Sequence, residues 1–220
     1  MNIIQELEAF LHEFNSSNNE DFNIDSIRVE FSKQHKLKEL EKLGVWCKVE
    51  KNSSLLSKLK KRLQKNEITS AWRLEKENIY YYNMQDAPQY RKAVLVIFGM
   101  KQYHKEPPLK ELITKIFMIM KNVSNIDICF DMIDKPNFEA LNEQFQFTPY
   151  ITNKGVLTNT RYINTTDIPM IEKITIYDKA FKNNLSSPLW RIEAKILIPN
   201  VNVLALPLYE LKEIIDIARI

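Results

Sequence analysis

Two neighbouring segments, ITIYDKAF (174–181) and LWRIEAKI (189–196), decide how the second half of this sequence folds. Both are rich in β-branched and aromatic residues, which favours β-strands. Both also carry charged residues where a strand buried on two sides would carry Val or Thr. Because side chains alternate between the two faces of a strand, each segment has one apolar and one polar face. A hairpin through KNNLSSP (182–188) would bring the two polar faces together.

The polar face of this predicted hairpin gathers a phenol, a carboxylate and several cations. Its members are Tyr177, Lys179, Arg191, Glu193 and Lys195. The carboxylate can hold a divalent metal ion, the cations can bind phosphate, and the tyrosine can act as a nucleophile. A solvent-exposed sheet face with ordinary cross-strand Lys–Glu pairs has the same alternation of charge, and it is the alternative interpretation.

A third segment, NIDICFDMID (125–134), adds acidic residues to this picture. Asp127 and Asp131 share one face of the expected strand, and Phe130 lies on the other. Two carboxylates on one face repel each other unless a cation or an arginine lies between them. Asp127 is therefore the first choice for a second metal ligand beside Glu193, with Asp131 as a further candidate. The alternative is a structural aspartate paired with an arginine or a lysine.

The rest of the chain predicts an α+β fold in which helices cover an antiparallel β-sheet. Apolar residues recur at helical spacing in 2–14, 54–65, 109–123, 136–145 and about 207–219. Strand-like segments occupy 24–31, 45–50, 71–84, 91–100, 126–133, 148–152, 160–165, 172–181 and 189–198. The segment AWRLEKENI (71–79) resembles LWRIEAKIL (189–197), which suggests pseudo-symmetric halves, 20–105 and 109–220, within a single nuclease-like domain of residues 1–220.

The composition excludes several classes of protein. Hydrophobic residues make up 45% of the 220 positions and charged residues 27%, as in a soluble globular protein. Three glycines are too few for a Gly-rich phosphate-binding loop, which argues against a nucleotide-driven motor and a Rossmann enzyme, so no nucleotide cofactor is expected. The sequence shows neither a secretion signal nor an apolar stretch of ~18 residues, so we expect a cytoplasmic protein without a membrane partner.

The net charge of +3 permits binding to nucleic acid without demanding it. The predicted helix 54–65 has a leucine face and a basic face, and a basic surface can follow phosphates. The candidate DNA-binding residues are Lys58, Lys61, Arg62, Lys182 and Lys195. The alternative for the helix is an ordinary solvated face.

The segments IDICFDM, ITIYDKAFKN and LWRIEAKI together resemble the Rep_trans-type initiators of rolling-circle plasmid replication and related phage replication initiation factors. The shared pattern is an acidic strand, a strand with I-Y-x-K and a strand with W-R-x-E, over about residues 125–197. In such initiators a tyrosine attacks a DNA phosphodiester next to a divalent cation, stays linked to the 5′ end and leaves a free 3′ hydroxyl. The resemblance implies that Tyr177 is the nucleophile and that Glu193 and Asp127 hold Mg²⁺ or Mn²⁺. It also implies that Lys179 and Arg191 steady the phosphate.

The same resemblance implies a site-specific DNA nickase that acts at a single-stranded or supercoiled origin. A host helicase and a second copy of the chain are the further partners that we expect. The bound cation would lower the pKa of the tyrosine from its usual ~10. No His-hydrophobic-His pair is present, so the His-ligated relaxases do not fit.

Two other functions stay open at this stage. The triplet from Glu193 to Lys195 reads E-x-K, and with Asp178 on the preceding strand it resembles PD-(D/E)xK nucleases, which hydrolyse DNA with activated water. The chain could also be an initiator-like module that binds DNA or a protein without cutting.

Overall fold

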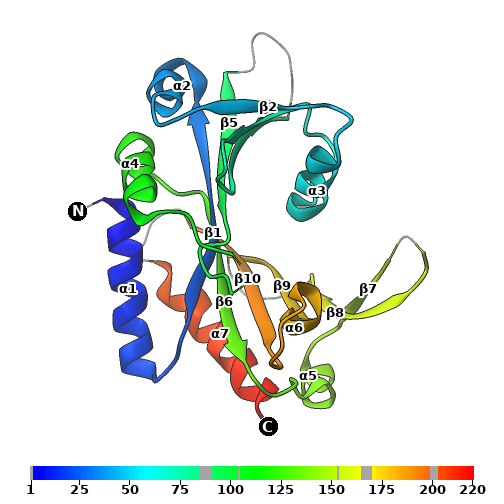
Figure 1. Cartoon of the computed structure of the whole chain (residues 1–220). Helices are drawn as coiled ribbons and strands as arrows, with labels where there is room; N and C mark the ends of the chain where they lie inside the picture. The colour runs from blue at the N-terminus through cyan, green and yellow to red at the C-terminus, as the bar shows by residue number, and fades with distance from the viewer. Residues whose placement is uncertain (1, 85–90, 104, 153, 165–169, 199–202) are drawn as a thin grey trace. The chain divides into compact units, whose positions relative to one another are not determined.

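The structure is a computed structural model that describes residues 2–84, 91–103, 105–152, 154–164, 170–198 and 203–220. These residues contain seven α-helices and ten β-strands, and their strands pair in antiparallel fashion (Figure 1). The predicted α+β class is therefore confirmed. The chain divides into two compact units: the first consists mainly of residues 26–102 and 106–124, and the second mainly of residues 7–25 and 125–220 together with Tyr103.

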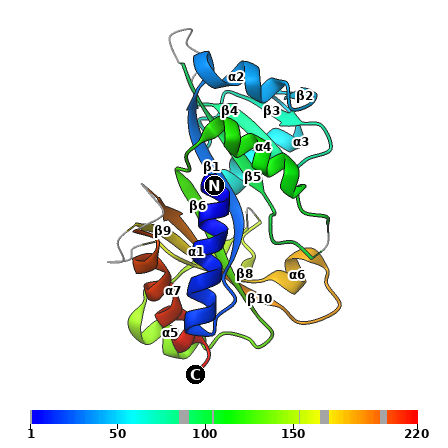
Figure 2. The ribbon, with the colours of Figure 1, turned by 90° about the vertical axis from the view of Figure 1, so that its left-hand side faces the viewer.

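The strands of the first unit follow the order β2-β3-β4-β5-β1. Their bounds are β1 (Asn23–Ser32), β2 (Trp46–Val49), β3 (Ser70–Leu74), β4 (Ile79–Asn83) and β5 (Lys92–Phe98). Helix α3 (Ser54–Leu63) covers one face of this sheet, because its leucines join a buried cluster with Tyr80, Tyr82 and Phe98. Helices α2 (Lys33–Glu41) and α4 (Lys110–Met120) pack against each other (Figure 2), and α2 contacts the other face through a hydrogen bond from Tyr81 to Glu41.

The strands of the second unit follow the order β6-β10-β9-β8-β7. Their bounds are β6 (Asn125–Met132), β7 (Thr148–Ile151), β8 (Leu157–Ile163), β9 (Ile171–Asp178) and β10 (Trp190–Leu197). Helices α1 (Ile3–Asn18) and α7 (Ala205–Ala218) lie side by side (Figures 1 and 2), with the rings of Phe14 and Tyr209 4.9 Å apart. Helix α5 (Phe138–Gln144) packs on α7, and the short α6 (Lys179–Asn183) joins β9 to β10.

The two units share one strand topology. In each, the first strand pairs with the last strand of a four-stranded meander: β1 with β5, and β6 with β10. This repeat agrees with the predicted pseudo-symmetry. The two similar segments that suggested it, 71–79 and 189–197, do not occupy equivalent positions in the two units, however. Trp72 lies in β3, the second strand of its meander, whereas Trp190 lies in β10, the fourth. The two W-R-x-E segments are therefore not equivalent positions.

Local hydrogen bonding and turns explain three differences from the predicted elements. The predicted strand 172–181 ends at Asp178, whose carboxylate caps α6 by accepting a hydrogen bond from the Phe181 N–H. The predicted strand 71–84 is two strands, because the chain turns between them at Lys76, which has a positive φ of 64°. Helix α2 was not expected, because its sequence is strongly polar and its buried residue is Leu40.

Within the described ranges, no helix combines the length and the apolar character that crossing a membrane requires.

Candidate functional site

Three adjacent strands of the second unit place polar side chains in rows on one face of the sheet. The antiparallel register aligns β6 with β10 and β10 with β9. Residues that pair directly across strands project to the same side of the sheet. The rows are Asp131–Arg191–Tyr177, Cys129–Glu193–Thr175 and Asp127–Lys195–Lys173. The polar face that the alternation in sequence predicts is thus assembled by the pairing of β6, β10 and β9.

Arg191 is the centre of a buried ion-pair cluster. Its side chain is 1% exposed, and its Nε and Nη2 donate hydrogen bonds to the two oxygens of Asp131 at 2.6 and 2.7 Å. Its Nη1 donates a further hydrogen bond to Asp25 Oδ1 at 2.6 Å. The Tyr103 hydroxyl donates to Asp131 Oδ2 at 2.8 Å. Asp131 and Arg191 therefore bind each other, which was the structural alternative for this aspartate, and the pair holds β6 against β10.

Tyr177 and Glu193 form the polar contact beside this cluster. The phenolic Oη of Tyr177 donates a hydrogen bond to Glu193 Oε2 at 3.2 Å, and the tyrosine is 7% exposed. The ammonium group of the exposed Lys182 lies 4.2 Å from the centre of the Tyr177 ring. Burial, and next the negative charge of Glu193, hold the pKa of Tyr177 well above its usual value. Loss of the phenolic proton at neutral pH therefore requires an acceptor close by, and Glu193 is in that position.

Glu193 has an unusually basic carboxylate. Burial raises its pKa first, the negative charges of Asp25 and Asp127 raise it further, and Lys182 and Arg191 oppose the shift, with a result of about 7. A carboxylate with a pKa near neutrality can exchange a proton with a neighbouring group at physiological pH. The same concentration of negative charge favours a cation at this place.

Glu193→Gln should stabilise the metal-free protein at pH 8 and have little effect near pH 4. A carboxyl whose pKa is raised in the folded state stabilises the fold at low pH, and this contribution is lost as the pH rises through about 7. The amide keeps the shape of the carboxyl without the charge, so we expect the variant to gain about 1–3 kcal/mol at pH 8. Urea unfolding in EDTA at both pH values measures the difference, and equal stability of the variant and wild type at pH 8 would contradict the raised pKa.

The predicted metal ligands fit a cation site only in part. Within the described residues, no three His, Cys, Asp or Glu side chains gather closely enough to bind a metal ion by themselves. Magnesium, however, is commonly held by one or two carboxylates, with water and substrate phosphate completing its coordination. Glu193 and Asp127 suit that mode, since they lie on the same sheet face and their charges interact. Asp131 suits it less, because both its oxygens accept hydrogen bonds from Arg191.

The predicted phosphate-binding cations fall in different surroundings. Lys179 is 4% exposed, and its ammonium group lies 5.1 Å from the centre of the Tyr103 ring. Burial, and then the charge of Arg191, lower the pKa of Lys179. Lys195 forms an ion pair with Glu172. Among these cations, Lys182 is both exposed and next to Tyr177, so it is the best placed to meet a phosphate.

The basic residues predicted on the helix of 54–65 lie in the first unit. Lys58, Lys61 and Arg62 are exposed on α3. The Arg62 guanidinium also packs 3.8 Å from the centre of the Phe98 ring, which fixes its position on the surface. The leucine face of α3 is buried, as the helical spacing of its leucines predicts.

Four residues of this region were not singled out from the sequence. Asp25 and Tyr103 enter the Arg191 cluster from distant parts of the chain, and no local pattern marks them. Lys173 and Tyr162 lie close together, with the ammonium group 3.6 Å from the ring centre. Burial lowers the pKa of Lys173 to about 8, although the charge of Glu193 opposes the shift. The alternation along β9, which selects Tyr177, selects Lys173 equally well.

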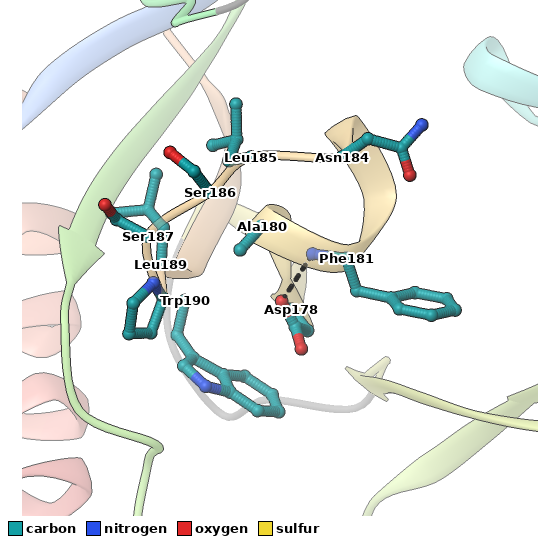
Figure 3. A pocket seen from close by; sticks show the side chains of 10 residues that line it. Asp178, Ala180, Phe181, Asn184, Leu185, Ser186, Ser187, Leu189 and Trp190 are labelled. Atoms are coloured by element: carbon teal, nitrogen blue, oxygen red, sulfur yellow. Dashed lines mark hydrogen bonds between the residues drawn. The ribbon is translucent and has the colours of Figure 1, made fainter.

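A cavity of about 310 Å³ lies beside α6, and Asp178 and Trp190 line it (Figure 3). Asp178 and Trp190 pair directly across β9 and β10, so both project away from the face that carries Tyr177 and Glu193. The Asp178 carboxylate is also engaged as the cap of α6, 2.8 Å from the Phe181 nitrogen. The arrangement of a PD-(D/E)xK nuclease requires Asp178 beside Glu193 and Lys195, and this geometry disfavours it.

No protein-family model and no curated protein matches the sequence significantly. A solved structure does match: a rolling circle replication initiator protein from Geobacillus stearothermophilus, with a TM-score of 0.51 and 14% sequence identity. The match covers 89% of this chain and 79% of the initiator chain. At this identity the likeness concerns the fold. The chain is similar in fold, over most of its length, to a rolling circle replication initiator protein.

Proposed function

We propose that this protein nicks DNA and transfers strands as a replication-initiator-like enzyme, with Tyr177 as the nucleophile. The observation that carries the proposal is the hydrogen bond from the Tyr177 phenol to a glutamate whose pKa is about 7. The initiator-like fold and the strand patterns around Tyr177, Asp127 and Glu193 support it. DNA, single-stranded or at a supercoiled origin, is the proposed substrate.

The proposed reaction is a transesterification at one phosphodiester. Glu193 Oε2 takes the phenolic proton while Tyr177 Oη forms a bond to phosphorus and the P–O3′ bond breaks. The 5′ side of the nick is then a phosphotyrosine ester, and the departing 3′ oxygen receives the proton back from Glu193. The ester keeps the energy of the phosphodiester, so the reverse reaction can rejoin a strand.

The neighbouring residues have separate proposed roles. Mg²⁺ or Mn²⁺, held by Asp127 and by the Oε1 of Glu193, would polarise the scissile phosphate and leave Oε2 to take the phenolic proton. Lys182 would bind a non-bridging phosphate oxygen and offset the charge that develops on the tyrosine oxygen. Arg191, which the resemblance placed in contact with phosphate, and Asp131, the further metal-ligand candidate, act instead as positioning residues, because each already binds the other.

The test is a nicking assay on supercoiled and single-stranded DNA, with Mg²⁺, with Mn²⁺ and with EDTA. We expect metal-dependent nicks and a protein–DNA adduct that survives denaturation and carries the 5′ end. Nicks without an adduct would replace the proposal with hydrolysis by activated water. Intact DNA binding without nicks in any metal would make the chain a non-catalytic binding module.

Mg²⁺ or Mn²⁺ should raise the melting temperature of the wild-type protein and have little effect on Glu193→Ala. A ligand at 100 times its Kd stabilises the folded state by about 2.7 kcal/mol, which corresponds to several degrees for a chain of this length. Glu172→Ala is the matched control, because it removes an acidic residue that pairs with Lys195. Differential scanning fluorimetry measures the shift, and an equal metal response in wild type and Glu193→Ala would remove Glu193 from the metal site.

A further inference from the structure

A second cavity, of about 240 Å³, lies wholly within the first unit and shares no residue with the site around Tyr177. Its lining includes Lys33, Lys48, Lys51, Ser70, Trp72 and Asn83. The register pairs Lys48 with Trp72 and Ser70 with Asn83, so these four side chains share one face of the sheet. The described residues of the lining include no acidic side chain. Three ammonium groups around one cavity favour an anionic ligand.

Asn83 supplies a second and independent sign of a ligand. It is 6% exposed, and its Nδ2 donates a hydrogen bond to Ser70 Oγ at 3.2 Å. Its Oδ1 is the one buried side-chain oxygen or nitrogen, among the residues that the structure describes, without a hydrogen-bond partner. A buried acceptor left without a donor costs about 1–3 kcal/mol, so such atoms call for an explanation. Asn83 lines the cavity, so a ligand there would provide one by bringing an N–H donor to Oδ1 once the amide turns toward it.

Trp72 supplies an aromatic surface at the same cavity. The indole is half-buried and stacks on Tyr81, with ring centres 4.8 Å apart and planes 14° from parallel. This stacking holds the indole in place before any ligand arrives. Rigid aromatic side chains beside cations are typical of proteins that bind single nucleotides of a nucleic-acid strand.

We propose that this cavity binds one nucleotide unit. The lysines hold its phosphate, Trp72 stacks on its base, and Asn83 Oδ1 accepts a hydrogen bond from a base N–H. The cavity is smaller than the roughly 300–1,000 Å³ of sites that enclose drug-sized ligands, so it can take no more than one nucleotide unit. The unit can belong to single-stranded DNA or be a free nucleotide, and the two share this chemistry. The proposal does not depend on cleavage by Tyr177.

The test measures binding in the full chain with Tyr177→Phe, so that no covalent step interferes. The probe is a labelled eight-nucleotide deoxyadenosine strand, followed by fluorescence anisotropy over a range of salt concentrations. Lys48→Ala with Lys51→Ala should weaken binding about 10-fold or more and lower the salt slope by about 0.7, which corresponds to the one phosphate that the lysines hold. The control is Lys38→Ala with Lys42→Ala, which removes the same charge from exposed positions of the same unit. Equal losses in the two double variants would overturn the proposal.

An abasic version of the strand tests the role of the base without relying on the fold of a variant. The protein with an unaltered cavity should bind the base-containing strand about 5- to 150-fold more tightly than the abasic strand. Trp72→Leu should remove this preference. Equal binding of the two strands by the intact pocket would contradict stacking on Trp72. Competition with free deoxyadenosine monophosphate identifies the source: displacement indicates a free-nucleotide site, and no displacement indicates a site for a strand.

Discussion

Tyr177→Phe should abolish strand cleavage while DNA binding persists. The substitution removes only the phenolic oxygen, which is the atom that forms the ester with phosphorus in the proposed reaction. Loss of a nucleophile lowers the rate by about 10³-fold or more, because the neighbouring groups have nothing to activate. The nicking rate and the yield of the denaturation-resistant adduct should both fall below detection, and the affinity for single-stranded DNA should stay within about twofold of wild type.

The matched control is Tyr150→Phe in β7, which removes a phenolic oxygen from the same sheet but outside the three aligned rows. It should cleave at the wild-type rate. Tyr177→Phe also loses its hydrogen bond to Glu193, at an expected cost of about 0.5–1.5 kcal/mol of folding stability. Urea unfolding therefore accompanies the assay, so that lost activity is not confused with lost structure. Cleavage by Tyr177→Phe within a few-fold of wild type would exclude Tyr177 as the nucleophile.

Arg191→Met should destabilise the protein more than any surface substitution near the site. Methionine fills a similar volume but leaves Asp25 and Asp131 buried without their shared cation. Removing one partner of a buried ion pair typically costs about 3–5 kcal/mol, because the remaining charge has lost its solvation by water and its partner. Urea unfolding followed by far-UV circular dichroism measures the loss at pH 7.

Lys195→Met is the control from the same strand. Its ion pair with Glu172 is partly exposed, with 29% of the lysine side chain accessible, so its loss should cost less than about 1 kcal/mol. The stability of the wild-type protein at low pH gives a second measurement. Although burial opposes it, hydrogen bonding to Arg191 lowers the pKa of Asp131, so this contribution to stability is lost as the pH falls below the usual range of the carboxyl. A cost for Arg191→Met no larger than that for Lys195→Met would show that the cluster does not hold the sheet together.

Alternation along single strands was sufficient to predict the polar face that carries Tyr177, Arg191 and Glu193. The period of two in β9 and β10 is a property of the extended backbone, so it can be read without knowing which strands are neighbours. The same holds for the leucine face of α3, whose helical period marks its buried side. Helix α2 was not predicted, because its polar sequence has no such period.

Only the tertiary structure decided which partners these residues contact. Asp25 and Arg191 are 166 positions apart in the chain, and their ion pair exists because strand pairing brings them together. That pairing also joins Arg191 to Asp131, and burial together with the charges of Asp25 and Asp127 raises the pKa of Glu193. The periodicity of apolar and polar residues is a property of the local sequence. Burial and Coulomb interactions depend on neighbours that are distant in sequence and come together only on folding.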